Sequence, residues 1–384
     1  MKILIDIRPL MDEKYSGVSE YVIRLLSALF EIDKTNQYIL FCNALHNVAE
    51  RLPKFDQPNV KIVVTHIPNK IFNYVMLWPF GRPYFDKLVK DKVDIFFMPH
   101  LHLAAISANV KSVLTIHDLS FLVNKQWFNW RKNIWHWFIN VQRLTRRFDK
   151  VIAVSYNTKK DLVDLCKIDS TKISVIHSGI DSAFKKIAVA DDQLQKVKAK
   201  YNLAKPFILF LATIEPRKNI EGLVKAFEIL KVKGNYPDLK LVLVGARGWK
   251  SEPIIARINS SSFKDDIIEL DYVDSADRPY IYNLASVFAY PSFYEGFGFP
   301  PLEAMACGVP VVASASSSLL EIVGDAGILV DPYNPAAIAT GLETVLSDTV
   351  LAASLGIRGQ ERAKQFSWEK AAGEYLGVFE KLIS

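Results

Sequence analysis

Short, nearly uninterrupted apolar runs alternate with amphipathic stretches along the whole chain, and this alternation restricts the fold more than any other feature. Strands that are buried on both faces of a parallel sheet have this composition. The sequence therefore predicts an α/β protein with two doubly wound, Rossmann-like parallel sheets in tandem. The predicted strands are 2–7, 38–42, 60–65, 93–98, 111–116, 151–155 and 173–176 in the first half, and 207–212, 239–244, 267–270, 287–290, 309–313 and 327–330 in the second.

The length of 384 residues suits two domains. We expect a first domain over 1–183 and a second over 184–367, with the polar, Lys-rich stretch 184–205 as a flexible linker. A final helix over about 368–382 belongs either to the second domain or, as we expect, to the first. Two such domains are predicted to face a central cleft at the carboxyl ends of their strands and to close on a ligand there.

Composition narrows the class of protein and its location. Half of the residues are hydrophobic, and Cys42, Cys166 and Cys307 are isolated, without metal-ligand or redox spacing. We expect no secretory signal, no membrane-spanning helix and no disulfides, hence a cytoplasmic protein. The net charge of +6 suits an anionic substrate or the inner face of the cell membrane. Nucleic acid is not an expected partner.

The densest motif reads as a strand, a glycine loop and a helix within residues 290–313. Gly296 and Gly298 allow the backbone to approach a ligand closely, and the prolines at 300–301 suit a first helical turn. The start of that helix is expected to offer free N–H groups and a positive dipole end to an anion. Glu295 and Glu303 flank the loop, either as a pair that binds a polyol or, for Glu303, as a mere dipole partner.

A second motif, Arg217-Lys218-Asn219, follows the strand at 207–212. Asn219 suits a helix N-cap. The two cations either form a solvated surface pair or, at a strand end facing the cleft, clamp a diphosphate. A strand-end position would leave Lys218 outside the core, so that its loss would leave the fold intact.

Two weaker signals lie in the first half. His117-Asp118 ends the strand at 111–116, where a structural pair and a functional one are about equally expected. Ser16-Gly17-Val18 opens a helix after the first strand, but a single glycine is a weak phosphate-loop signal.

Together these segments resemble the retaining glycosyltransferases of family 4, over essentially the whole chain. The turn at 178–181 and the segment 366–368 also match the family pattern. The resemblance implies a GT-B fold. The resemblance implies that Glu303 binds the nucleotide ribose and that Glu295 contacts the donor sugar. It also implies that Arg217 and Lys218 bind the diphosphate and that His117 lies at the reacting sugar. It implies donor contacts for Gly17, Gly296, Phe297, Gly298 and Leu302. Relatives often have two glycines in the first loop, where this chain has Ser16-Gly17.

The resemblance also implies an activity. It is the metal-independent, cofactor-free transfer of a hexose, with retention of configuration, from a nucleotide sugar to a glycan or lipid-linked acceptor. GDP-mannose is the favoured donor and UDP-glucose the next. The Asp-x-Asp triplet with which other glycosyltransferases hold a cation does not occur in the sequence. An inactive binding subunit would be expected to have lost some of the five charged or histidine site residues. A sugar-nucleotide epimerase of the same architecture fits the two motifs less well.

The segment 126–147 carries four of the seven tryptophans beside several basic residues. Aromatic and basic side chains together suit a membrane interface. Alternatively, the helix packs its aromatics on the first sheet, which the absence of a clean one-face tryptophan stripe slightly favours. Insertion of Trp127 and Trp130 into an anionic bilayer is the prediction that separates the two interpretations.

Overall fold

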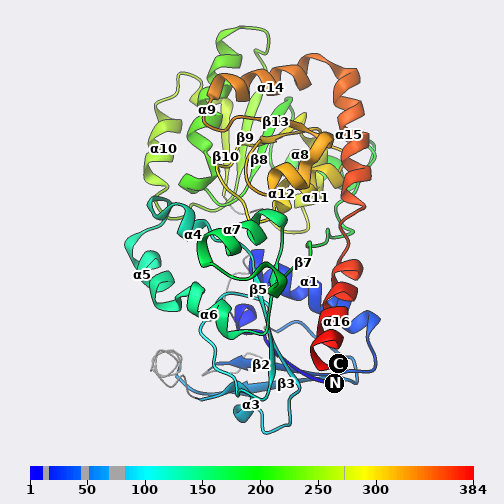
Figure 1. Cartoon of the computed structure of the whole chain (residues 1–384). Helices are drawn as coiled ribbons and strands as arrows, with labels where there is room; N and C mark the ends of the chain where they lie inside the picture. Colours follow the sequence, from blue (N-terminus) through cyan, green and yellow to red (C-terminus); the bar gives the residue numbers. More distant parts are fainter. Residues whose placement is uncertain (12–16, 45–51, 69–82, 272) are drawn as a thin grey trace. The chain divides into compact units, whose positions relative to one another are not determined.

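The computed structural model describes residues 1–11, 17–44, 52–68, 83–271 and 273–384. Two compact units are present (Figure 1). The first unit consists of three separate stretches, Met1–Leu119, Arg131–Gly179 and Ser367–Ser384, and the second consists of Ser120–Trp130 and Ile180–Phe366. Residues 120–130, predicted in the first domain, thus pack with the second unit.

The first unit is built on a seven-stranded parallel sheet. Its strands are β1 (Lys2–Asp6), β2 (Gln37–Asn43), β3 (Val60–Thr65), β4 (Ile95–Met98), β5 (Lys111–Ile116), β6 (Lys150–Ala153) and β7 (Ile173–Val175). They lie in the order β3-β2-β1-β4-β5-β6-β7. The direction of winding reverses between β1 and β4, which is the point where such sheets bind ligands.

The second unit has a six-stranded parallel sheet in the order β10-β9-β8-β11-β12-β13. Its strands are β8 (Phe207–Leu211), β9 (Lys240–Val244), β10 (Ile267–Leu270), β11 (Val287–Tyr290), β12 (Val311–Ser314) and β13 (Ile328–Val330). Winding reverses between β8 and β11. Each predicted apolar run overlaps one strand of the two sheets, so the expected pair of doubly wound α/β units is confirmed.

Helices cover both sheets (Figure 1). Those of the first unit are α1 (Gly17–Ile32), α3 (Phe85–Leu88), α5 (Trp130–Ile139, whose first residue falls in the second unit), α6 (Val141–Arg147), α7 (Tyr156–Cys166) and α16 (Trp368–Ile383). Those of the second are α4 (Ser120–Val123), α8 (Asp192–Lys200), α9 (Ile220–Val232), α10 (Glu252–Asn259), α11 (Arg278–Leu284), α12 (Phe299–Ala306), α13 (Leu319–Val323), α14 (Pro335–Ser347) and α15 (Thr349–Ala363).

The stretch predicted as a flexible linker instead contains helix α8. Asp191 caps this helix by accepting the N–H of Leu194, and the side chains of Leu194 and Val197 are buried. The N–H of Ile187 also donates to the Asn283 side chain, 2.8 Å away. Residues 184–205 are therefore partly docked on the second unit, because two apolar side chains one helical turn apart are enough to bury one face of a short helix.

Helix α16 packs in the first unit beside α1, as Figure 1 shows. The hydroxyl of Tyr375 lies 2.7 Å from those of both Tyr21 and Thr115, and Phe379 is fully buried. The helix start approaches Gly179 so closely that a Cβ there would lie 2.2 Å from the Trp368 nitrogen, so this position requires glycine. The last residues of the chain, 367–384, thus complete the hydrophobic core of the first unit, which also contains the first residues.

Candidate functional site

The strongest candidate site lies at the switch point of the second sheet. Strand β8 leads into a 3-10 turn, Pro216–Lys218, and the neighbouring strand β11 leads into the glycine loop. Because the carboxyl ends of parallel neighbours meet at one edge of the sheet, the two strongest sequence motifs come together there.

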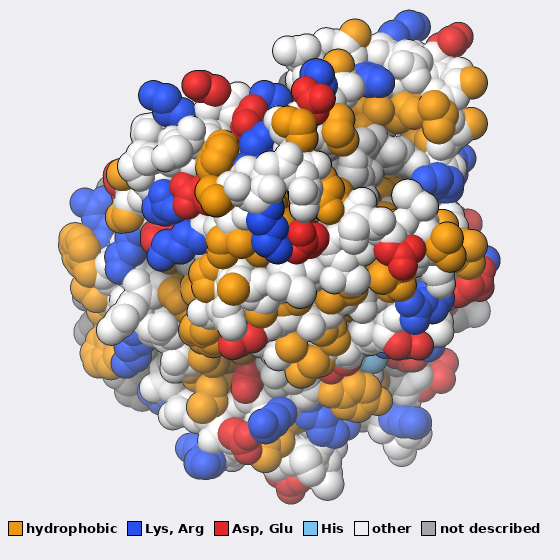
Figure 2. Space-filling model, turned by 90° about the horizontal axis from the view of Figure 1, so that it is seen from above, with side chains coloured by type: hydrophobic (Ala, Val, Ile, Leu, Met, Phe, Trp, Pro, Cys, Tyr) orange, Lys and Arg blue, Asp and Glu red, His pale blue; other side chains and the backbone are white. Residues whose placement is uncertain are grey.

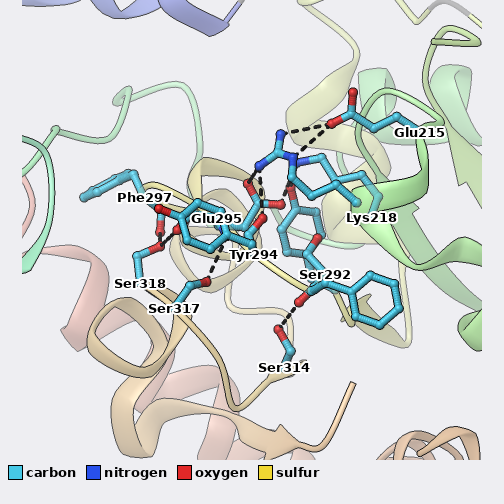
Figure 3. Close-up of polar contacts among 12 residues, drawn as sticks. Glu215, Lys218, Ser292, Tyr294, Glu295, Phe297, Ser314, Ser317 and Ser318 are labelled. Carbon is cyan, nitrogen blue, oxygen red and sulfur yellow. Dashed lines mark hydrogen bonds and ion pairs between the residues drawn. The ribbon is translucent and has the colours of Figure 1, made fainter. Parts of the chain in front are cut away.

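Two cations and two acids form a buried cluster at this edge (Figure 3). The Lys218 Nζ lies 2.6 Å from Glu295 Oε1 and 2.8 Å from the Tyr290 hydroxyl. The Arg217 guanidinium donates to Glu295 Oε2 at 3.0 Å and, through Nη2 at 2.9 Å, to Glu215 Oε1. Glu215, to which the sequence analysis gave no role, therefore orients Arg217. This role of Glu215 is visible from its ion pair in the folded chain, and not from its spacing in the sequence.

Burial and the neighbouring charges together set the protonation of this cluster. It would by itself raise the pKa of Glu295, but Arg217 and Lys218 outweigh it and hold the pKa at about 2. Burial, with Arg217 adding to it, lowers the pKa of Lys218 despite the opposing carboxylates of Glu295 and Glu215. At neutral pH Glu295 is a carboxylate, which can accept bonds from hydroxyl groups but cannot donate a proton.

The expectation that Lys218 lies outside the core is wrong. Only 7 % of its surface is exposed. The strand end carries the side chain inward, against Tyr290 and Glu295, rather than into solvent. Loss of Lys218 therefore removes an internal ion pair and lowers stability as well as changing the site.

Asn219 occupies the N-cap position of α9, but its side chain makes no capping bond. Its backbone adopts a left-handed conformation with φ of 56°. The side-chain amide instead donates to the carbonyl of Pro291 at 3.0 Å and to that of Pro332 at 2.6 Å. The residue therefore ties the Arg-Lys turn to the loop that follows β11, which corrects its predicted role as a helix cap.

Serines after β12 hold the glycine loop in place (Figure 3). The Glu295 N–H donates to Ser317 Oγ at 2.8 Å, and Ser318 Oγ donates to the carbonyls of Glu295 and Phe297. These serines were not among the predicted residues, although the run Ser316-Ser317-Ser318 could have indicated them. Gly298 has φ of 118°, a conformation that side chains disfavour.

The start of α12 differs from the expected anion site. Its residues Pro300 and Pro301 have no N–H, and no side chain caps the helix. The start of this helix can therefore attract an anion more through the helix dipole than through hydrogen-bond donors. The side chains of Phe297 and Leu302, for which donor contacts were expected, are buried in the second unit.

Glu303 is buried on α12 and joined to α11. Arg278 Nη2 lies 2.7 and 2.9 Å from its two carboxylate oxygens, and the Tyr282 hydroxyl donates to Oε2 at 2.7 Å. These bonds occupy part of the accepting capacity of the carboxylate and fix its direction. The main contacts of Glu303 are thus hydrogen bonds and an ion pair with specific side chains, which its interpretation as a helix-dipole partner does not include.

His117 and Gly17, the remaining predicted residues, lie in the first unit. His117 is half-buried, its Nε2 donates to the Pro99 carbonyl at 2.8 Å, and its ring meets the Tyr21 ring edge-on. Burial lowers its pKa, so the ring is neutral at pH 7. Gly17 is exposed and begins α1, with no atom within 4 Å of where a Cβ would stand. Ser16 lies outside the described residues.

The switch point of the first sheet holds residues that the sequence analysis did not identify. Asp6 is the last residue of β1 and is fully buried. Arg8 Nη2 lies 2.6 Å from its Oδ2. His100, after β4, places its Nε2 3.5 Å from the same oxygen. Burial lowers the pKa of His100 to about 3 against the pull of Asp6, so this ring is also neutral. A polar or charged residue at the end of one buried strand and another two residues after the end of the next are the signal that could have identified them.

Two family matches divide the chain almost as its two units do. Residues 15–184 match "Glycosyltransferase Family 4", and residues 191–362 match "Glycosyl transferases group 1". A relative, the O-antigen chain mannosyltransferase B of Escherichia coli, is 29% identical over 399 residues, covering 100% of both chains.

Solved structures share the fold. A sucrose-phosphate synthase from Thermosynechococcus elongatus superposes with a TM-score of 0.77 at 22% identity, covering 100% of this chain and 99% of the other. The Anabaena protein HepE, solved in complex with UDP and glucose, gives 0.73 at 19% identity and covers 99% of both chains. At these identities the likeness concerns the fold alone.

Proposed function

Since this chain belongs to the glycosyltransferases, with a family 4 domain followed by a group 1 domain, we propose that it transfers a hexose from a nucleotide sugar to a glycan or lipid-linked acceptor. GDP-mannose is the favoured donor, because the relative that matches from end to end is named a mannosyltransferase. UDP-glucose is the next candidate. The buried cluster around Lys218, Arg217 and Glu295 carries the proposal.

The cluster suits a donor whose leaving group is a diphosphate. Its two cations and two carboxylates balance, so no excess charge is buried before the donor arrives. We propose that the sugar hydroxyls bond to Glu295 while the diphosphate contacts Arg217 and Lys218. As the bond to the sugar breaks, negative charge grows on the leaving phosphate, and fixed cations stabilise that charge in a site of low dielectric.

The configuration of the sugar is proposed to be retained. The acceptor hydroxyl attacks from the face that the diphosphate leaves, and a departing phosphate oxygen takes its proton. Glu295 remains ionised and does not take part in proton transfer. His117 is proposed to contact the reacting sugar, where a neutral imidazole forms hydrogen bonds without adding charge.

Donor panels test the function and separate the alternatives. The purified chain is incubated with GDP-mannose, UDP-glucose and related donors, with and without a lipid-linked glycan, and products are identified by mass spectrometry. We expect a product one hexose larger only when acceptor is present. Isomerised donor without acceptor would indicate an epimerase. An inactive binding subunit would be stabilised by a nucleotide, by about 2.7 kcal/mol at 100 times its dissociation constant, yet form no product.

We expect transfer activity to survive excess EDTA. Arg217 and Lys218 supply the positive charge that a divalent cation supplies elsewhere. Among the described residues, no three His, Cys, Asp or Glu side chains are grouped to hold a metal. Rates are compared before chelation, after it, and after adding back Mg²⁺ or Mn²⁺. Complete loss of activity with EDTA that either metal restores would contradict the proposal.

Glu303→Ala should weaken binding of the free nucleoside diphosphate by roughly tenfold to a hundredfold, since hydrogen bonds to a charged group contribute about 1.5–3 kcal/mol. The proposed reason is the loss of its bond to the ribose. Calorimetric titration measures the affinity, with Tyr282→Phe as the control. That variant removes one bond to the carboxylate but keeps the carboxylate itself, so stability should fall and affinity should hold. If both variants bind the diphosphate like the wild type, the ribose assignment is wrong.

A further inference from the structure

Helix α5 exposes a continuous apolar stripe. Trp130 is 67 % exposed, Ile134 46 %, Trp137 74 % and Phe138 46 %. Their spacing of four, three and one residues places all four on one side of the helix. We call these four residues the α5 stripe. The tryptophans that face outward thus form the clean one-face stripe that the full set of tryptophans lacks in the sequence.

The other two tryptophans of this segment are packed against the protein. The Trp127 ring stacks on Phe293 with an interplanar angle of 5°, and its carbonyl accepts the indole N–H of Trp249 at 2.7 Å. The Trp135 ring contacts His102 edge-on. Trp127 is half-buried and packed in this way, so it is not part of the α5 stripe. Of the four tryptophans, Trp130 and Trp137, both in the α5 stripe, are the exposed ones.

The chain segment that contains the α5 stripe is basic. No Asp or Glu occurs between Asp118 and Asp149, whereas this stretch holds six basic residues: Lys125, Arg131, Lys132, Arg143, Arg146 and Arg147. The whole chain has 47 basic and 41 acidic residues, so the excess of +6 equals the charge of this stretch. On the face drawn in Figure 2, basic, acidic and hydrophobic side chains are intermingled.

Two of these arginines repel one another. Arg143 and Arg147 are exposed and stand one turn apart on α6. Burial, with Arg143 adding to it, lowers the pKa of Arg147. An anionic partner would relieve this repulsion. A second copy of the chain would not, because a two-fold contact through this surface would place one basic patch against another.

We propose that α5 and α6 form a docking surface for an anionic lipid bilayer. The α5 stripe lies at the boundary between headgroups and acyl chains, and the arginines contact lipid phosphates and carboxylates. The surface goes beyond the transfer reaction and does not depend on it. Among the described residues no single helix is long and apolar enough to cross a bilayer, and the one bent pair that passes, Pro335–Ser347 with Thr349–Ile383, does so by length and composition only.

Vesicle co-sedimentation of the full chain tests the apolar part of the surface. The chain should bind vesicles of phosphatidylcholine with roughly a third phosphatidylglycerol at low salt, and less at physiological salt. Trp130→Ser with Trp137→Ser should weaken partitioning about tenfold or more. The matched control is Val350→Ser with Ile357→Ser, which removes two side chains that are 79 % and 63 % exposed at the same spacing on α15. It should bind like the wild type.

A second pair of variants tests the charge. Arg143→Gln with Arg147→Gln should weaken binding by about tenfold or more and flatten its salt dependence, since each basic residue near an anionic surface adds about 1 kcal/mol. Lys370→Gln with Lys381→Gln, both exposed on α16, changes the net charge equally and should have little effect. Thermal unfolding confirms that each variant is folded. If the Trp130→Ser, Trp137→Ser variant is unfolded, the variant Ile134→Ser with Phe138→Ser is used in its place.

Two outcomes would overturn the proposal. One is wild-type protein that stays in the supernatant with anionic vesicles even at low salt. The other is self-association, seen by sedimentation velocity and abolished by the tryptophan variants, without lipid binding. In that case the stripe is an interface between copies. Neither readout uses catalysis, so failure here is distinguishable from failure of the proposed transferase activity.

Discussion

Replacing Lys218 with alanine should lower donor turnover by on the order of a hundredfold or more, which is the loss seen when a fixed group that stabilises developing charge is removed. The variant should also be less stable. Glu295 would keep Arg217 but lose its shortest ion pair, at 2.6 Å, inside the protein. We expect a cost of about 2–3 kcal/mol, below that of a buried charge left with no partner.

A second buried lysine of the same unit provides the control. Lys231, on α9, is buried and lies 2.8 Å from Asp266, away from the β8–β11 switch point. Lys231→Ala should lower the unfolding temperature to a similar extent and leave turnover largely intact. Both variants are assayed well below their unfolding temperatures. A folded Lys218→Ala protein with near wild-type turnover would show that the cluster is structural only.

Removal of α16 should prevent the first unit from folding. A chain that ends at Lys364 would lose Trp368, Tyr375 and Phe379, all of which are buried. Loss of one buried aromatic side chain costs about 3–5 kcal/mol, and a whole domain is stable by only about 5–15 kcal/mol. We expect loss of cooperative unfolding for the first unit and rapid proteolysis within it.

A milder truncation and a point variant sharpen this prediction. A chain ending at Lys381 loses only 382–384, which are largely exposed, and should retain its full stability. Tyr375→Phe removes the hydroxyl next to both Tyr21 and Thr115, and should cost about 1–3 kcal/mol. If the chain ending at Lys364 unfolds cooperatively and turns over its donor normally, α16 is dispensable.

The strands could be predicted from the sequence because parallel strands buried on both faces are apolar without interruption. The helix in the supposed linker could not. Leu194 and Val197 supply its only buried side chains, and their burial depends on docking against the second unit. A hydrophobic pattern this short is indistinguishable from that of a polar connection until its neighbours are known.

The proximity of the two strongest motifs could be predicted from the sequence, but the electrostatics of the cluster could not. Arg217, Lys218 and Glu295 are identified by their motifs, and the order of the strands brings them together. The burial of Lys218 and the part played by Glu215 depend on which way side chains turn at a strand end. The same holds for the tryptophans, since sequence alone does not show that Trp127 packs inward while Trp130 faces outward.

The discontinuous first unit sets an order for folding during synthesis. The ribosome makes Met1–Leu119 and Arg131–Gly179 early, but Ser367–Ser384, which completes their core, follows the whole of Ile180–Phe366. At about 5–20 residues per second, the apolar face that α16 covers stays open for roughly 10–40 seconds. The second unit has all six of its strands before α16 emerges. The second unit can therefore fold first. Substitutions in it that slow its folding would increase aggregation of the nascent chain, although no residue of the first unit is changed.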